Sequence, residues 1–528
     1  MMNLDGHKLS TRQLWDGAAG KEKCRLAPAA RKAMSQSSAL VQRLAKEPRA
    51  VYGINTGYGP LSHTRISPKD LRQHQVNLIH HLSVGQGTLF SPVETRAIII
   101  ARANALARGY SGIRQKVVEL LLNCLNRGIL PDIPSEGSVG ASGDLIPLAH
   151  MARMLIGLGK VRVNGRPMDA VKALKTQKLS PVRLECKEGL ALVNGTSVMT
   201  ALASLAVCEA KQILSWMELL SACLIQVLKA APEVLCEQLH AARGHRGQMA
   251  VARRMTEYLH SHPAYARLID EHHWGTNAKS PNPGTEIQDA YSIRCSPQIL
   301  GACQDALWHI EQVVTRELNA ATDNPLIFPS TDSVIHGGNF YGQHIAMVSD
   351  YLQIGLTTTA LLCERQLERL VNWRYSSGLP PLLTGADPGL NTGMGGCQIL
   401  ATSLAAEART LAVPASIQTI PTNANNQDVV SMGCIAAKKV RSTLKIVWKL
   451  LAIQSLALAQ AADLRRDKSI MGTHYRKLYR LVRSVSAPLK EDRPLYEDIQ
   501  KVCDALQLDK VQAKMFSDRP PNPFRLTD

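Results

Sequence analysis

The stretch "VMTALASLAVCEAKQILSWMELLSACLIQVLKAA", residues Val198–Ala231, decides the fold class. It is apolar over most of its length and contains neither glycine nor proline, which favours one long helix. A helix of this length could also cross a bilayer. Because Glu209, Lys211 and Glu218 interrupt the apolar run, we expect a buried core helix and no membrane span.

Further long helical patterns follow this stretch. They cover residues 300–321, 341–371, 398–412 and 431–463. Glycine and proline gather between them, as in "SSGLPPLLTGADPGLNTGMGG", residues 376–396. Helices near or above twenty residues in length predict an elongated central bundle.

The residues before Val198 have a mixed character. Residues 92–130 predict two helices broken near 109–112, and "KVRVNGRPM" (Lys160–Met168) predicts a hairpin through Asn164-Gly165. We therefore predict a mainly α fold in two domains. A smaller mixed α/β domain covers residues 1–196, and a long-helix domain with the C-terminal helices covers residues 197–528.

Composition bears on both the core and the possible partners. Aromatic residues make up only 4% of the 528 residues, so the core must consist mostly of aliphatic side chains. The formal net charge is +18, concentrated locally only at Arg465–Arg483, where Tyr475, Leu478 and Val482 recur at helical spacing. This pattern favours a solvated helix face, and no nucleic-acid-binding motif accompanies it.

The twelve cysteines include no CxxC pair and no histidine partners at metal-ligand spacing. Buried thiols in a reducing compartment are the simplest interpretation. The first residues, "MMNLDGHKLSTRQLWDG", contain no apolar segment typical of a signal peptide. We therefore expect a cytoplasmic protein without a metal site.

A glycine-rich turn, "GSVGASGDLIPLAH" (Gly137–His150), precedes a short helical pattern. Asp144 is a good N-cap residue for that helix, which we expect over 145–156. Ala141-Ser142-Gly143 would then lie just before a helix N-terminus, where free N–H groups collect.

If this turn is bent tightly, the nitrogen of Gly143 can approach the carbonyl carbon of Ala141. Ring closure with loss of water gives an imidazolone, and loss of the Ser142 hydroxyl as a second water leaves an exocyclic methylidene. Such a group is a strong electrophile made from the chain alone. An ordinary serine and glycine turn that caps a helix is the alternative that these three residues leave open.

Six further stretches narrow that choice: "VYGINTGYGPL" (51–61), "QVNLIHHLSVGQG" (75–87), "EGLALVNGTSVMT" (188–200), "QDAYSIRCSPQILG" (288–301), "NPLIF…HGGNFYG" (324–342) and "IPTNANNQDVVSMG" (420–433). Together with residues 137–150 and in this order, they resemble the aromatic amino acid ammonia-lyases and the related aminomutases. The resemblance implies a fumarase/aspartase-like ammonia-lyase fold. It also implies that Ala141-Ser142-Gly143 cyclises by itself to 4-methylidene-imidazol-5-one (MIO), with no metal and no external cofactor.

The resemblance further implies a homotetramer with active sites shared between subunits, and we expect Tyr52 and Ser142 to arrive from different chains. Tyr52 becomes the base for the substrate β-proton, which requires a depressed tyrosine pKa. Taken alone, Tyr52 could equally be a buried tyrosine that anchors a loop. No nucleic acid or membrane is expected as a partner.

The resemblance also implies roles for residues of "QDAYSIR", mainly at the carboxylate end of the substrate. Gln288, Tyr291 and Arg294 follow each other at spacings of three, which places them on one face if this stretch is helical. By resemblance, Arg294 holds the substrate carboxylate with its planar fork. Tyr291 lies beside the MIO, and Gln288 completes the polar network.

Two positions bear on the substrate. His81-Leu82 resembles the pair in tyrosine-using members, since an imidazole can bond a phenol hydroxyl. Histidine ammonia-lyases typically have glutamate where this chain has Gln427, which argues against histidine as substrate. Asn194 is implied to contact the substrate carboxylate or the MIO. The remaining expected substrate contacts are Leu145, Phe340, Asn423 and Asn426.

The expected activity is non-oxidative deamination of L-tyrosine to trans-p-coumarate and ammonia, with an alkaline optimum because the attacking amine must be neutral. A tyrosine 2,3-aminomutase making β-tyrosine and a lyase of mixed phenylalanine and tyrosine specificity are the close alternatives. A non-catalytic basic binding protein is the alternative of a different class.

Overall fold

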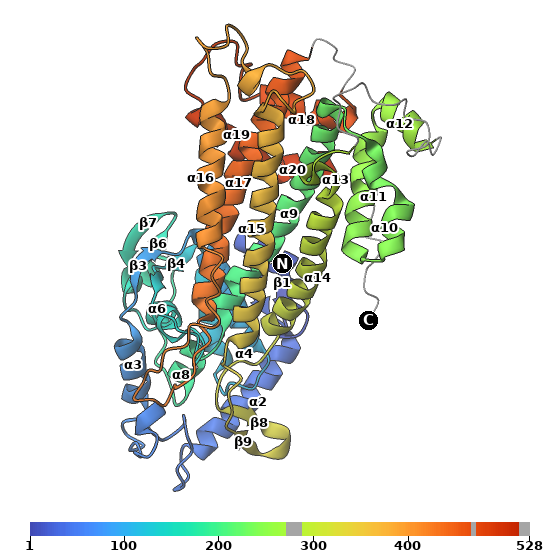
Figure 1. Ribbon diagram of the computed structural model, residues 1–528. Coiled ribbons are helices and arrows are strands. Elements are labelled where there is room, and N and C mark those ends of the chain that lie inside the picture. Colours follow the sequence, from blue (N-terminus) through green and yellow to red (C-terminus); the bar gives the residue numbers. More distant parts are fainter. Residues whose placement is uncertain (271–287, 466–470, 517–528) are drawn as a thin grey trace. The chain divides into compact units, whose positions relative to one another are not determined.

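Helices make up most of the chain in the computed structural model, which describes residues 1–270, 288–465 and 471–516 (Figure 1). The α-helices are α1 (Thr11–Ala18), α2 (Pro28–Leu44), α3 (Leu71–Leu82), α4 (Pro92–Ala107), α5 (Gln115–Asn126), α6 (Leu145–Leu155), α7 (Ala170–Thr176), α8 (Glu188–Val193), α9 (Ser197–Leu228), α10 (Glu237–Arg243), α11 (Arg246–His260), α12 (Pro263–Asp270), α13 (Tyr291–Arg294), α14 (Ser296–Leu318), α15 (Gln343–Val371), α16 (Gly395–Thr410), α17 (Gly433–Leu464), α18 (Thr473–Arg483), α19 (Tyr496–Gln507) and α20 (Asp509–Phe516).

The strands of the described residues are short and form four small sheets. They are β1 (Met2–Leu4), β2 (Cys24–Leu26), β3 (Gln86–Leu89), β4 (Ile129–Pro131), β5 (Pro134–Glu136), β6 (Lys160–Val163), β7 (Arg166–Asp169), β8 (Leu326–Phe328) and β9 (Ser333–Ile335). β1 and β2 pair in parallel, while β3–β5, β4–β6–β7 and β8–β9 are antiparallel. The mainly α class is therefore confirmed.

The chain forms two compact units. The first contains Met1–Cys208, Ile310–Asp350 and Pro414–Arg441, and the second contains Glu209–His309, Tyr351–Val413 and Ser442–Asp528. Each unit is thus built from separate stretches of sequence. The division into two consecutive domains, 1–196 and 197–528, stays a prediction.

The long helices agree with the sequence pattern to within a few residues, because their apolar runs and their glycine and proline boundaries are unambiguous. By length and composition, α9, α15 and α17 could each cross a membrane. The most apolar windows of α9 and α17 are 83% buried inside the protein, and that of α15 is 67% buried. Packing within the protein thus accounts for much of their apolar surface.

Buried polar contacts join the helices of the second unit, where α9, α15 and α17 run side by side (Figure 1). Gln366 on α15 donates to Ser221 Oγ on α9 at 2.9 Å and accepts from Gln454 Nε2 on α17 at 2.8 Å. Arg254 on α11 forms a buried two-point ion pair with Glu218 on α9, at 2.6 and 2.7 Å. These pairs fix the helix register, because unpaired buried polar groups are costly.

In the first unit, the β6–β7 hairpin turns through Asn164 and Gly165, whose φ angles are 50° and 79°. Both angles are positive, as the predicted Asn-Gly turn requires. The two helices expected in 92–130 are α4 and α5, separated by the glycines Gly109 and Gly112. This unit also contains the glycine-rich turn before α6.

Candidate active site

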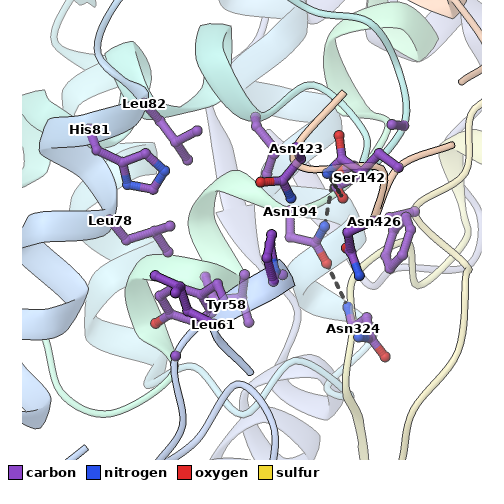
Figure 2. A pocket seen from close by; sticks show the side chains of 18 of the residues that line it. Tyr58, Leu61, Leu78, His81, Leu82, Ser142, Asn194, Asn324, Asn423 and Asn426 are labelled. Carbon is purple, nitrogen blue, oxygen red and sulfur yellow. Dashed lines mark hydrogen bonds between the residues drawn. The ribbon is translucent and has the colours of Figure 1, made fainter. Parts of the chain in front are cut away.

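A cavity of about 970 Å³ lies in the first unit and gathers many of the expected site residues (Figure 2). Twelve of them line it: Tyr52, His81, Leu82, Ala141, Ser142, Gly143, Leu145, Asn194, Phe340, Asn423, Asn426 and Gln427. They come from segments far apart in the sequence. Their roles in a reaction stay predictions, whereas their convergence on one cavity is a structural fact.

The glycine-rich turn is packed so closely that side chains are excluded. Gly143 has a φ of +71° and forms a backbone bridge with Gly195. A Cβ atom at Gly143 would lie 2.2 Å from the carbonyl oxygen of Gly195, so only glycine fits. The N–H of Asp144 donates to that same oxygen at 2.8 Å. The turn is therefore anchored to the segment that precedes α9.

Asp144 corrects one expectation. It precedes α6, but its carboxylate makes no capping bond to α6. It instead accepts the N–H groups of Val198 and Met199 at 2.9 Å, in the first turn of α9, and the hydroxyl of Ser138 at 2.8 Å. Burial raises the pKa of Asp144 to about 6, against the opposing effect of these donors and of Arg102. Asp144 thus ties the turn to the dipole of the long helix.

Two amide side chains hold the oxygens of Ser142. Asn194 Nδ2 donates to the backbone carbonyl of Ser142 at 2.8 Å, and Gln427 Nε2 donates to its hydroxyl at 2.9 Å. The Oδ1 atom of Asn194 accepts the N–H of Asn324 at 2.8 Å, as the dashed lines of Figure 2 show. The amide of Asn194 therefore has one preferred orientation.

Helix α3 forms the cavity wall opposite Ser142 and contributes Leu78, His81 and Leu82 to it (Figure 2). His74 and Asn77 from the same helix also line the cavity, and neither was predicted from the sequence. Their spacing from His81, seven and four residues, places them on its helix face and is the signal that could have found them.

Two tyrosines line the cavity near each other. Tyr52 accepts the N–H of Gly59 at 3.4 Å, whereas Tyr58 accepts a bond from Gln75 Nε2 at 2.8 Å. Tyr58 also stacks on His74, with ring centroids 4.4 Å apart. Removal from water raises the pKa of Tyr58 far above its usual range, so Tyr58 stays protonated.

Tyr52 and Ser142 line the same cavity of a single chain, so the expectation that they arrive from different chains is wrong. The reason is local packing. A Cβ atom at Gly53 would lie 2.8 Å from Pro325 and 2.9 Å from Leu190, so the segment after Tyr52 lies directly against its own chain. Leu190 is part of α8, which leads to Asn194.

Gln288, Tyr291 and Arg294 do not line this cavity and belong to the second unit. The expectation of one shared helix face fails for Gln288, because α13 begins only at Tyr291. The Arg294 guanidinium lies 4.6 Å from the centre of the Tyr291 ring, and the Tyr291 side chain is 69% exposed.

The cavity wall contains no aspartate, glutamate, lysine or arginine among the residues that the structure describes. Burial lowers the pKa of His74, which keeps its ring neutral at pH 7. The lining therefore consists of apolar side chains with hydroxyl, amide and imidazole groups. Such a wall suits a neutral ring that has a hydrogen-bonding substituent.

Comparison with known proteins decides the family. The family model described as aromatic amino acid lyase matches residues 9–484. The histidine ammonia-lyase of Caldanaerobacter subterraneus subsp. tengcongensis is 39% identical over 510 residues, covering 96% of this chain and 97% of the relative. This chain belongs to the aromatic amino acid lyase family.

Solved structures of the family share the fold. The tyrosine aminomutase of Streptomyces globisporus superposes with a TM-score of 0.91 at 36% identity, covering 98% of both chains. The phenylalanine aminomutase of Pantoea agglomerans superposes with a TM-score of 0.90 at 32% identity, covering 97% of this chain and all of the other. The aromatic amino acid lyase fold is thus shared along nearly the whole chain.

Proposed function

We propose that this chain is an MIO-dependent ammonia-lyase that converts L-tyrosine to trans-p-coumarate and ammonia. The observation that carries the proposal is the cavity itself. It has His81 on one wall, the Ala141-Ser142-Gly143 turn on another, and no carboxylate side chain in its described lining. The imidazole of His81 can form a hydrogen bond with the hydroxyl group of a phenol ring, either as donor or as acceptor.

Gln427 is the second support for a neutral substrate ring. Its amide donates to the Ser142 hydroxyl at 2.9 Å, a bond that an ionised glutamate could not donate. Related histidine ammonia-lyases are 37–40% identical to this chain, and the tyrosine aminomutase of Streptomyces globisporus is 36% identical to it, so overall identity alone does not select the substrate. The substrate depends on these few side chains in the cavity.

The turn fits the proposed prosthetic group. Gly143 leaves no room for a Cβ atom, Ala141 is small and buried, and both oxygens of Ser142 have donors. Once formed, the MIO supplies an electrophile for the substrate amine. The chain's own contribution is to hold the turn at a helix start, where backbone N–H groups favour developing negative charge.

In the proposed reaction the base that takes the substrate β-proton is Tyr52, which lines the cavity. Its oxygen accepts the Gly59 N–H, so the phenol hydrogen is free to point elsewhere. The carboxylate of the substrate needs a cation, and the described lining of this cavity has no arginine or lysine. We infer that Arg294 of another subunit supplies it, within a homotetramer in the cytoplasm.

A tyrosine 2,3-aminomutase is the second candidate, favoured by the similarity to the Streptomyces globisporus tyrosine aminomutase. In such an enzyme ammonia returns to the β-carbon before the product leaves. A lyase of mixed phenylalanine and tyrosine specificity differs only in how strongly the cavity prefers the phenol.

The first test is incubation with L-Tyr, L-Phe and L-His, with acrylate absorbance and β-amino acid formation followed together. We expect trans-p-coumarate to be the main product and L-Tyr to give the highest kcat/KM. Predominant β-tyrosine would favour the aminomutase. A highest kcat/KM for L-His would contradict the proposed substrate.

His81→Phe is expected to shift preference from tyrosine toward phenylalanine. The phenol hydroxyl would lose its partner in a desolvated site, which lowers the kcat/KM ratio of L-Tyr to L-Phe by roughly 10- to 100-fold. His80→Phe is the matched control, because His80 is adjacent on α3 but does not line the cavity. An equal shift in both variants would rule out a ring-reading role for His81.

A further inference from the structure

The charged side chains buried in the first unit include Arg102, Asp144, Lys187 and Asp323. Asp144 holds the start of α9, and Arg102 donates to the carbonyl groups of Ala191 and Asn194. Lys187 and Asp323 do not line the cavity, and the proposed reaction does not use them.

Lys187 and Asp323 form a buried ion pair with further hydrogen bonds. Lys187 Nζ donates to Asp323 Oδ2 at 2.9 Å and to the carbonyl of Ser111 at 2.9 Å. The hydroxyl of Ser111 donates to the other carboxylate oxygen at 3.1 Å. Both charged side chains are at most 1% exposed. A buried ion pair seldom adds net stability, so a role in fixing one geometry is the better explanation.

Each member of the pair stands next to a segment that contacts Asn194. Lys187 directly precedes the six-residue helix α8, and Asn194 directly follows it. Asp323 directly precedes Asn324, whose N–H donates to Asn194 Oδ1 at 2.8 Å. The pair therefore joins the chain before α8 to the chain that orients the Asn194 amide.

The orientation of Asn194 matters because its Nδ2 donates to the Ser142 carbonyl at 2.8 Å. If the amide turned over, its NH₂ group would face the N–H of Asn324, and two donors would meet. The hydrogen bond to the Ser142 carbonyl withdraws electrons from it and makes the adjacent Cα–H more acidic.

That acidity bears on ring formation, which releases two waters. The Gly143 nitrogen bonds to the Ala141 carbonyl carbon, whose oxygen leaves as water with the hydrogens of the Gly143 and Ser142 nitrogens. Ser142 then loses its Cα hydrogen and its hydroxyl as the second water, which leaves a Cα=Cβ double bond. No oxidant or reductant is needed.

We propose that Lys187 and Asp323 are positioning residues for this dehydration. Their ion pair keeps the Asn324 N–H against Asn194, and Asn194 thereby keeps its amide on the Ser142 carbonyl. This inference rests on the proposed function, because it concerns formation of the MIO. It assigns to two buried residues outside the cavity a role in maturation of the site.

The test is Asp323→Asn, which keeps the size of the side chain and removes its charge. We expect most chains to retain one or both waters by intact-protein mass, and kcat per total protein to fall in the same proportion, by about 10-fold or more, with little change in KM. Glu218→Gln is the matched control, since Glu218 forms the buried pair with Arg254 in the second unit. It should lower the Tm comparably while its chains lose both waters completely.

Complete loss of both waters in Asp323→Asn would overturn the inference, as would incomplete loss in Glu218→Gln. If Asp323→Asn does not fold, the double variant Lys187→Met/Asp323→Leu decides. This variant removes both charges, so that no unpaired charge is left buried. Incomplete water loss in the folded protein supports the role, and complete loss overturns it. Absence of water loss in the parent protein would instead contradict the proposed function.

Discussion

Ser142→Ala is expected to lower kcat by about 1,000-fold or more on every aromatic amino acid, because alanine has no hydroxyl to lose. The methylidene would not form, and the mass of the mature protein would retain the water that the parent loses from Ser142. The fold should persist, since the carbonyl of residue 142 keeps its bond from Asn194 Nδ2. Activity assays and intact-protein mass measure both effects.

Ser135→Ala is the control for this change. Ser135 lies on β5, just before the turn, but does not line the cavity. We expect parental kcat and complete loss of both waters in this variant. Parental turnover by Ser142→Ala would show that the turn is an ordinary helix-preceding turn and that no MIO takes part.

Tyr52→Phe is expected to lower kcat by roughly 100- to 10,000-fold while KM changes little, the size of effect typical of losing a general base. Phenylalanine keeps the ring that packs edge-on to His336, with centroids 5.9 Å apart. The protein should therefore fold normally. Steady-state kinetics with L-Tyr measures the loss of turnover. Intact-protein mass shows whether both waters are still lost, which distinguishes a role of Tyr52 as the base from a role in ring formation.

Tyr58→Phe offers a sharp comparison within the same cavity. Its hydroxyl is committed to Gln75, and the raised pKa of Tyr58 makes it a poor base. Removing that hydroxyl should cost some stability, about 1–3 kcal/mol, because the Gln75 amide loses a partner. A smaller fall in kcat than in Tyr52→Phe is expected, and a larger one would transfer the role of base to Tyr58.

The long helices could be read from the sequence because their information is local. The apolar runs in α9, α15 and α17 and the glycine and proline clusters between helices set both type and extent. Asn164-Gly165 likewise specified the β6–β7 hairpin by its backbone preference alone. Such features need no knowledge of distant parts of the chain.

Asp144 shows where local information fails. By sequence it is an N-cap for the helix that follows, but the carboxylate reaches the first N–H groups of a helix that begins more than fifty residues later. Any acceptor beside two helix starts can serve either one. Which it serves depends on the bridge between Gly143 and Gly195, a contact that no sequence spacing encodes.

By itself, the sequence determined the mainly α class, the helix lengths, the family resemblance and most of the residue types around the cavity, because these follow from local patterns and recognisable motifs. Only the tertiary structure decided that Tyr52 and Ser142 face one cavity of one chain and that Gln288 and Arg294 do not. It alone joined Lys187 to Asp323, since pairing of buried charges depends on long-range packing.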